Sequence, residues 1–359
     1  MSQYLVLDPA YWKTFLTPDR YTYEHIPDLT GKVAIVTGAN SGLGYATTVG
    51  LAAHGAHVFM ACRSEARCKE TMVRIRQEVA ERFPNGPWRE HPDGPSVKLE
   101  FLEVDMNDLS KVQAAAEQFL QTGLPLHLLV NNCGIGGTPW VLSADGIEQQ
   151  FAVNYLGPFA FTMALLDRLK ESQPSRIVNV SSTAYERFVA EGTDFQTIRT
   201  ESESDMTPYD RYARSKFASI LFTKALSRRL ANDLVYCNVL YPGIVDTDFG
   251  HHSNTITTTN ITIAERVMKA AQRSFTHLIG VSPEKGALTV LHAATALEIE
   301  YRDARGKFFI PVGNQMRVNR ILEEEGRQEE LWRFSEAMVN EKLKAGKHAK
   351  MQTIMQKEE

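Results

Sequence analysis

The sequence places a tyrosine and a lysine four residues apart, at Tyr212 and Lys216, within the stretch DRYARSK. The stretch continues as FASILFTKALSRRL, which is rich in helix formers, so both side chains are expected on one face of a helix. A nearby ammonium favours the charged form of a phenol, whose pKa is ordinarily about 10. Such a phenol becomes usable as an acid or base near neutral pH. The spacing alone is a weak pattern, so its meaning depends on the residues that the fold brings beside it.

A glycine-rich turn, TGANSGLG, follows the first apolar run and precedes a helical pattern. Glycines at such a turn let backbone N–H groups approach a pyrophosphate at the positive end of the following helix. A glycine pattern is common in loops, but its position between a strand and a helix is the context that a dinucleotide site requires. The sequence therefore predicts a bound dinucleotide at Gly38, Gly42 and Gly44, with polar contacts from Asn40 and Ser41.

The end of the second predicted strand, ACRS, indicates which dinucleotide is bound. An NAD site usually has an Asp or Glu about 20 residues after the glycines, where it accepts a hydrogen bond from the ribose 2′-OH. Here Arg63 stands at that point, and no carboxylate precedes Glu65. A guanidinium matches the 2′-phosphate of NADP, so the sequence favours NADP(H) over NAD(H). The alternative is that Arg63 forms a salt bridge in solvent with a nearby acidic residue.

Short apolar runs alternate with amphipathic helical patterns along most of the chain. The runs are rich in Val, Ile and Leu, as is typical of strands that are covered on both faces. They lie at 32–38, 57–63, 97–105, 126–132, 176–182, 235–243 and 307–310. The alternation predicts an α/β fold, a single Rossmann-type, doubly wound parallel sheet of about seven strands with helices on both faces.

The expected organisation is one large domain with an addition at each end. An N-terminal extension is expected at 1–30 and the main domain at 31–320, with a substrate loop at about 244–282. A C-terminal helical tail is expected at 321–359. Helices around 146–170 and 209–231 could pair in a homodimer, or the tail could cover that surface instead.

The composition excludes several classes of protein. The formal net charge is −4, with 43% hydrophobic and 23% charged residues, which argues against the basic face that a nucleic-acid partner requires. No apolar run reaches the ~18 residues of a transmembrane span, and the N-terminus lacks the features of a secretory signal. His54, His57, His251 and His252 form no convincing ligand cluster, so no metal site is predicted. We therefore expect a cytoplasmic protein.

Seven motifs in a fixed order make the chain similar to the short-chain dehydrogenase/reductase family, from about Leu29 to about Val312. They are TGANSGLG, Asp105 in LEVDMND, NNCG at 131–134, Asn154 in FAVNYLG, Ser182 in IVNVSS, the Tyr212–Lys216 pair and PGIVDTD at 242–248. Within the family the pattern resembles the retinol-dehydrogenase-like and WW-domain-oxidoreductase-like members. It looks most like the fungal members of that branch, several of which serve secondary metabolism.

The resemblance implies a role for each motif residue. Tyr212 would exchange the proton of the alcohol, and Lys216 would favour its phenolate and hold the nicotinamide ribose. Ser182 would hydrogen-bond the substrate oxygen, and Asn154 would help hold a water that links Lys216 to solvent. Asp105 would hold the adenine ring. Further cofactor contacts are implied at Leu43, Asn132, Pro242, Gly243, Val245 and Thr247.

The chain departs from the family pattern in two places. Cys133 replaces the usual alanine, and a reactive role for it is improbable without an activating base beside it. A polar, acidic insertion at 191–208 lengthens the separation between Ser182 and Tyr212. Because these two side chains would meet in space rather than along the chain, the insertion need not spoil the site. Ser181, Tyr185 and Tyr209 are the neighbouring competitors that the spacing favours less.

The resemblance implies an NADP(H)-dependent oxidoreductase that acts on CH–OH groups. It would interconvert a ketone or aldehyde and an alcohol on a small, moderately apolar molecule, with secondary-metabolite biosynthesis as one setting. Two alternatives stay open: a dinucleotide-binding regulatory protein without turnover, and an epimerase or lyase on the same scaffold. Intact Ser182, Tyr212 and Lys216 argue against the regulatory protein. The substrate pocket is expected between the segments 184–208 and 244–282.

Overall fold

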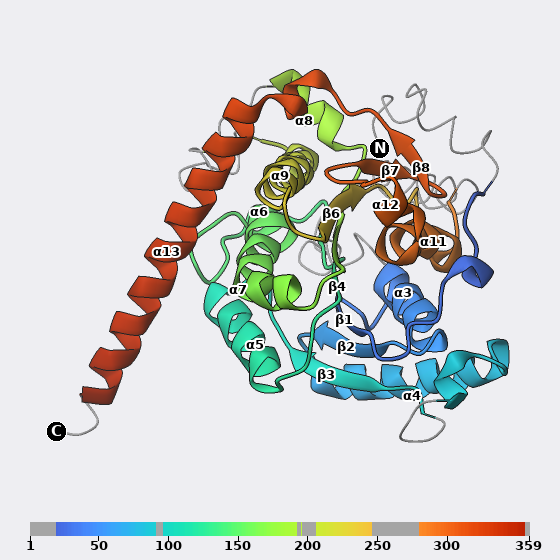
Figure 1. The fold of residues 1–359 in the computed structure, drawn as a ribbon. Helices are drawn as coiled ribbons and strands as arrows, with labels where there is room; N and C mark the ends of the chain where they lie inside the picture. Colours follow the sequence, from blue (N-terminus) through green and yellow to red (C-terminus); the bar gives the residue numbers. More distant parts are fainter. Residues whose placement is uncertain (1–18, 91–95, 192–194, 196–205, 246–279, 356–359) are drawn as a thin grey trace, which may run out of the picture.

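The computed structural model describes residues 19–90, 96–191, 195, 206–245 and 280–355. They form one eight-stranded sheet with the strand order β3-β2-β1-β4-β5-β6-β7-β8 (Figure 1). All neighbouring strands pair in parallel except β7 and β8, which pair antiparallel. The strands are β1 Val33–Thr37, β2 His57–Cys62, β3 Leu99–Glu103, β4 Leu128–Asn131, β5 Ser175–Val180, β6 Val235–Leu240, β7 Phe308–Ile310 and β8 Asn314–Met316.

The predicted fold class is confirmed, and each of the predicted apolar runs coincides with a strand, although β5 begins one residue before its run. The sheet has one strand more than the expected seven. This strand, β8, is a three-residue edge strand that follows β7 through a tight turn at Gly313, whose φ is +70°. Its sequence, NQM, contains no apolar run and is only partly buried, so hydrophobic patterning does not indicate it.

Helices cover both faces of the sheet, as doubly wound connections require. Helices α5, α7 and α9 lie on one face of the sheet and α3, α4 and α11 on the other (Figure 1). Side chains of β1 alternate between the two cores: Val33 and Ile35 lie in the core under the first group, and Ala34 and Val36 in the core under the second. The helices are α3 Gly42–Ala53, α4 Glu65–Arg82, α5 Leu109–Gln121, α6 Gln149–Phe151, α7 Gly157–Glu171, α8 Tyr185–Glu191, α9 Pro208–Arg229, α11 Pro283–Thr295, α12 Glu298–Tyr301 and α13 Glu325–Met355. A π-helical turn, Ala152–Leu156, joins α6 to α7.

The C-terminal helix α13 packs along the outside of α9 and reaches α5 (Figure 1). Its residues Leu331, Trp332 and Met338 are buried in the same core as α7 and α9. The tail therefore covers part of the surface around 209–231, where pairing of two chains was considered from the sequence. Within the described residues, no helix combines the length and the apolar character that a membrane crossing needs.

Candidate active site

The predicted site residues follow the carboxyl ends of the parallel strands. The glycine turn follows β1, Asn132 and Cys133 follow β4, Ser182 follows β5, and Pro242 and Gly243 follow β6. Carboxyl ends of parallel strands meet at one edge of a sheet, which is where open α/β sheets bind their ligands. Tyr212 and Lys216 reach this edge from the first turns of helix α9, which precedes β6 in the sequence.

The glycine turn has the backbone geometry that only glycine adopts readily. Gly38 and Gly42 have φ values of +66° and +51°, in the left-handed region. A Cβ at Gly44 would lie 2.2 Å from Gly38 O, so no other residue fits there. Ser41 is the N-cap of α3 but makes no side-chain capping bond. The first N–H groups of α3 are therefore not taken by a capping side chain, which suits a phosphate ligand.

Asn132 hydrogen-bonds Thr37, the residue that precedes Gly38 of the glycine turn. Its Nδ2 donates to Thr37 O at 2.9 Å, and its backbone N–H donates to Thr37 Oγ1 at 2.9 Å. The backbone N–H of Cys133 donates to the same hydroxyl, also at 2.9 Å. The side chain that the resemblance assigned to cofactor contact thus gives one of its two N–H donors to the last residue of β1.

The other expected cofactor residues lie at the same edge, with one exception. Arg63 is exposed after β2 and forms no ion pair among the described residues. Asp105 follows β3, and its Oδ1 accepts from Asn107 N at 3.0 Å. A Cβ on Gly286 of α11 would meet Val245 Cγ2 at 2.7 Å and Leu43 Cδ1 at 3.3 Å, so these two side chains flank one point of α11. Thr247 lies outside the described residues.

Ser182 and Tyr212 are joined by a hydrogen bond between their hydroxyl groups. The Ser182 oxygen also accepts from the backbone N–H of Ala184 at 3.1 Å. This second bond leaves the serine hydrogen for another acceptor. The structure therefore brings together two groups that lie on either side of the acidic insertion in the sequence.

Lys216 lies one helical turn after Tyr212 and is 3% exposed. Its Nζ donates to Val180 O at 2.9 Å and stands 5.6 Å from the centroid of the Tyr212 ring. No ion pair joins it to a carboxylate among the described residues. Burial lowers the pKa of Lys216 to about 8, because the ammonium loses its hydration.

The pKa of Tyr212 moves in the opposite direction from the one that the Tyr–Lys spacing predicts. Burial raises it above its ordinary value, although the hydrogen bond with Ser182 opposes the change. Desolvation of the phenolate is the largest cause, and it exceeds the lowering by the Ser182 hydrogen bond. The phenol is thus a proton carrier at neutral pH rather than a ready base.

Asn154 lies in the π-helical turn, and all three of its side-chain bonds are internal. Its Oδ1 accepts from Ile135 N at 2.8 Å, and its Nδ2 donates to Ile135 O at 2.8 Å and to Ser215 Oγ at 2.9 Å. π-helical turns are rare and often occur at functional sites. Here the turn places a buried amide between the loop after β4 and the residue that precedes Lys216.

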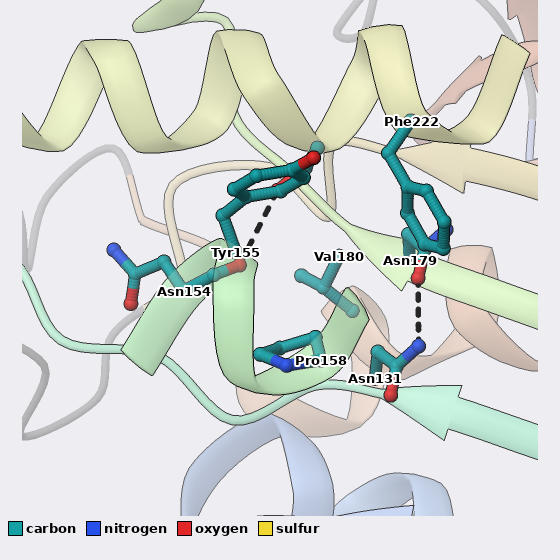
Figure 2. A pocket seen from close by; sticks show the side chains of 8 residues that line it. Asn131, Asn154, Tyr155, Pro158, Asn179, Val180 and Phe222 are labelled. Carbon is teal, nitrogen blue, oxygen red and sulfur yellow. Dashed lines mark hydrogen bonds between the residues drawn. The ribbon is translucent and has the colours of Figure 1, made fainter. Parts of the chain in front are cut away.

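A small internal cavity adjoins Asn154 (Figure 2). Its volume is about 10 Å³, which is room for one water molecule. Val180, whose carbonyl accepts the Lys216 bond, lies on its wall. Asn131 also lines it, and the buried Asn131 Oδ1 accepts no hydrogen bond from the described residues. The cavity is therefore polar enough to hold the water that the resemblance places near Asn154 and Lys216.

The competing side chains are engaged elsewhere. Ser181 is buried and donates to Lys216 O at 2.9 Å. Tyr185 is fully buried, and its hydroxyl donates to Glu186 Oε1 at 3.2 Å. Tyr209 lies beside the Arg187 guanidinium, which is 5.7 Å from its ring centroid. Burial raises the pKa of Cys133 to about 11, in keeping with an unreactive thiol.

Sequence reasoning missed a group of charged residues next to Tyr212. Glu148, Arg211 and Arg214 are 0%, 1% and 0% exposed, yet each stands in a stretch whose polarity suggests a solvated helix face. The signal that could have indicated them is the position of Arg211 and Arg214 around a tyrosine that must itself be enclosed. Within the described residues, no group of three His, Cys, Asp or Glu side chains could hold a metal ion.

Comparison with known proteins adds an independent observation. The family model described as short chain dehydrogenase matches residues 32–195. An uncharacterized oxidoreductase of Schizosaccharomyces pombe is 34% identical over 328 residues, which span 90% of this chain and 89% of that protein. Retinol dehydrogenase 14 of Mus musculus is 36% identical over 309 residues, 86% of either chain. A crystal structure of an uncharacterized Mycobacterium paratuberculosis protein has a TM-score of 0.59 at 27% identity, covering 89% of this chain and 97% of that one.

Proposed function

The chain belongs to the short-chain dehydrogenase/reductase family of oxidoreductases, and we propose that it interconverts a carbonyl compound and an alcohol with NADP(H). The observation that carries the proposal is the hydrogen bond between Ser182 and Tyr212, one helical turn from a buried lysine. The substrate would be a small, moderately apolar molecule. The relative named retinol dehydrogenase supports that class, since retinol is an apolar alcohol.

The glycine turn and Arg63 fit an NADP molecule. The positive φ values at Gly38 and Gly42 and the uncapped start of α3 provide backbone N–H groups for a pyrophosphate. Arg63, exposed and without an ion pair among the described residues, provides a guanidinium for the 2′-phosphate. When bound, the reduced nicotinamide supplies the hydride that reduces the carbonyl carbon.

Tyr212 would act as the acid in reduction. Its raised pKa keeps the phenol protonated near neutral pH, so it can donate to the substrate oxygen as that oxygen gains charge. Ser182, whose oxygen already accepts from Ala184 N–H, would donate its hydrogen to the same oxygen. The ammonium of Lys216 would then stabilise the phenolate that remains, because no carboxylate neutralises it among the described residues.

Cofactor binding and turnover of the full-length protein test the proposal. Nicotinamide fluorescence should show NADPH bound about tenfold more tightly than NADH, which is about 1.4 kcal/mol. The protein should then reduce aldehydes and ketones of increasing apolar size, and one NADPH should be consumed for each alcohol molecule formed. Tight binding without turnover would instead indicate a regulatory protein, and product without net NADPH consumption would indicate an epimerase or lyase.

We further propose a cytoplasmic location, from the composition, and a role in secondary metabolism, from the fungal members that the motifs resemble. Imaging of the tagged protein in its host tests the location. Metabolite profiles of the host with and without the gene test the role.

A further inference from the structure

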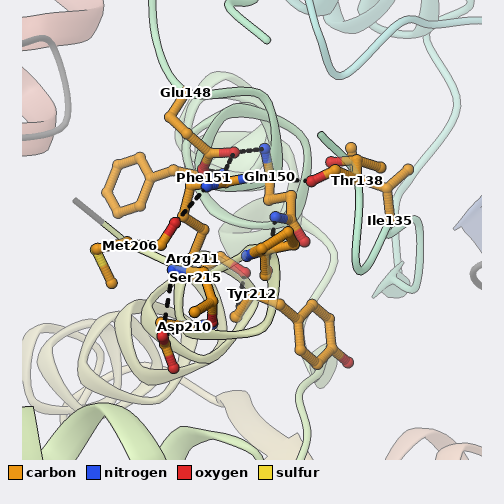
Figure 3. Close-up of polar contacts among 12 residues, drawn as sticks. Ile135, Thr138, Glu148, Gln150, Phe151, Met206, Asp210, Arg211, Tyr212 and Ser215 are labelled. Carbon is orange, nitrogen blue, oxygen red and sulfur yellow. Dashed lines mark hydrogen bonds and ion pairs between the residues drawn. The ribbon is translucent and has the colours of Figure 1, made fainter. Parts of the chain in front are cut away.

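Glu148 and Arg211 are buried next to Tyr212 (Figure 3). With the buried Arg214, whose charge also acts on Glu148, they form a charged cluster. Figure 3 shows the phenol of Tyr212 pointing away from this Glu148 cluster, so these charges are not aimed at the reacting oxygen. Burying a charge is costly unless partners compensate it. The partners that compensate Arg211 and Glu148 come from different segments of the chain, so these contacts hold the segments together.

Arg211 joins two segments that border the site. Its Nη1 donates to Met206 O at 2.6 Å, in the turn that precedes α9, and its Nη2 donates to Thr138 O at 3.0 Å, in the loop after β4. Its Nε faces Glu148 Oε1 at 3.5 Å. A planar guanidinium can serve these three acceptors at once, whereas an ammonium of similar length cannot.

Glu148 adds a third segment to the same junction. Its two carboxylate oxygens accept from Gln150 N and Phe151 N, each at 2.9 Å, at the start of the helix that contains the π-helical turn. Gln150 repeats the connection, because its Oε1 accepts from Gly137 N at 3.0 Å and its Nε2 donates to Pro208 O at 2.9 Å. The loop after β4, the start of α6 and the start of α9 are thereby fixed to one another twice.

The junction continues to the reacting groups through Asn154. The Asn154 side chain bonds both backbone groups of Ile135 and donates to Ser215 Oγ, which in turn donates to Tyr212 O at 2.7 Å. The backbone of Tyr212 is therefore held between the Glu148 cluster at Arg211 and the Asn154 bonds at Ser215. A shift of the α9 start relative to the loop 135–138 would move the phenol.

We propose that Arg211 and Glu148 are positioning residues that set the placement of the Tyr212 hydroxyl for proton transfer. This inference rests on the proposed function, since it assigns the pair a part in that reaction. The pair acts through the backbone of α9 and touches neither substrate nor cofactor. Misplacement of a reacting group by about 1 Å can cost on the order of 100-fold in rate, so loosening of the junction should lower kcat.

Arg211→Lys is the main test, and Arg176→Lys is its matched control. Arg176 is also buried, 5% exposed, and its guanidinium likewise bonds a backbone carbonyl, Ala296 O at 2.8 Å, and a carboxylate, Glu300 Oε1 at 2.7 Å. It lies at the amino end of β5, on the opposite edge of the sheet from Tyr212. Both variants keep the charge and lose the planar fork.

We expect Arg211→Lys to lower kcat for carbonyl reduction by about 10- to 100-fold while the NADPH Kd changes by less than about twofold. Arg176→Lys should lower Tm by a similar amount and leave kcat within about twofold of the wild type. Gln150→Met, which removes the second set of bonds without altering charge, should lower kcat by a smaller factor. Equal kcat losses in Arg211→Lys and Arg176→Lys, or an unchanged kcat in Arg211→Lys, would overturn the proposal.

Hydrogen exchange on the full-length variants separates this proposal from the proposed function. Arg211→Lys should speed amide exchange in 135–138 and 207–212, whereas Arg176→Lys should leave both segments unchanged. A wild-type protein that consumes no NADPH with any carbonyl would remove the proposed function, and the exchange pattern would then decide the positioning role. Unchanged exchange in both segments of Arg211→Lys would overturn it.

Discussion

Lys216 in the first half of α9 and the cations in the second half have opposite electrostatic settings. In the second half, Lys224 pairs with Glu323 at 2.8 Å, and Arg228 and Arg229 both pair with Glu329, at 2.8 and 2.6 Å. In the first half, the buried Lys216 bonds a backbone carbonyl and forms no ion pair with a carboxylate among the described residues. The second half pairs its cations with carboxylates, whereas the first half pairs Arg211 with Glu148 and keeps Lys216 without a counter-charge among the described residues.

This difference separates a structural use of charge from a functional one. The pairs of Arg228 and Arg229 with Glu329 attach α13 to the domain, and the Lys224–Glu323 pair attaches the short 3-10 turn that precedes α13. Arg229 also lies 3.8 Å from the centroid of the Trp332 ring. The bond from Lys216 to Val180 O needs a donor but not a charge, and burial of the charge costs stability. A protein retains a destabilising charge where the chemistry requires it, so the comparison itself supports a catalytic role for the first half.

The largest expected effect is that of Tyr212→Phe, which removes the acid from the first half. Because general acid catalysis contributes about 10²- to 10⁴-fold, kcat should fall by that factor. Nicotinamide fluorescence should show NADPH binding within about threefold of the wild type, since the phenyl ring keeps its packing. Tyr209→Phe, one turn earlier on the same helix, is the control and should keep its turnover. Residual activity of Tyr212→Phe equal to that of the control would remove the proton-donor role.

Lys216→Met and Lys224→Met test the two halves against each other. Loss of the uncompensated cation should lower kcat by about 100-fold and raise the free energy of unfolding by about 1–3 kcal/mol. Loss of the neutralised cation should leave kcat unchanged and lower the free energy of unfolding by at most about 1 kcal/mol. Urea denaturation and steady-state kinetics measure both quantities. Stabilities that change in the same direction would contradict the comparison.

The pH dependence should report the same uncompensated charge. With a pKa of about 8, Lys216 loses its proton as the pH rises through that value, so the rate of carbonyl reduction should fall there. Stability should change with the opposite sign. Between pH 8 and the unfolded value of about 10.4, the unfolded chain holds this proton and the folded chain does not, so unfolding becomes less favourable as pH rises. This rise in the free energy of unfolding with pH should be absent from the Lys216→Met variant.

Arg63→Ala extends the comparison to a cation outside α9. Because Arg63 is exposed and has no ion pair among the described residues, its charge is available to a 2′-phosphate. NADPH affinity should fall by about tenfold, or about 1.4 kcal/mol, and NADH affinity should stay the same. Fluorescence titration with each cofactor measures the effect. An equal loss for both cofactors would show that Arg63 does not distinguish them.

The smallest effect is expected from Glu329→Gln in the second half. The change removes partners of Arg228 and Arg229 at a site open to solvent, so the free energy of unfolding should fall by at most about 1 kcal/mol. High salt should reduce the difference from the wild type, because screening already weakens the pair. Turnover should not change. A loss of turnover would show that the docking of α13 reaches the active site.

Much of the fold could be predicted because its signals are local. The seven apolar runs coincide with strands because a sheet covered on both faces needs continuous hydrophobic segments. The edge strand β8 has no such requirement and was missed. The π-helical turn at Asn154 could not be predicted, since one extra residue in a helical turn leaves no periodic trace in sequence.

The site could be predicted only as far as its motifs extend. The motifs placed Ser182 and Tyr212, and the structure adds the hydrogen bond that joins them. The direction of the Tyr212 pKa could not be predicted, because it depends on burial by residues distant in the sequence. For the same reason the enclosure of Arg211 and Glu148 by the fold could not be predicted. The family assignment that the motifs indicated is confirmed by the relatives.

The packing of α13 against the domain makes the oligomeric state of the protein depend on whether this helix is intact. Tyr155, next to Asn154, bonds Ser335 of this helix at 2.6 Å, and Trp332 packs against both Phe159 and Phe222. A second chain could reach the part of α9 that α13 covers only by displacing that helix. Proteolytic removal of α13 would therefore expose apolar side chains of α7 and α9 while every motif residue remained, and the trimmed chain should self-associate more than the full-length chain.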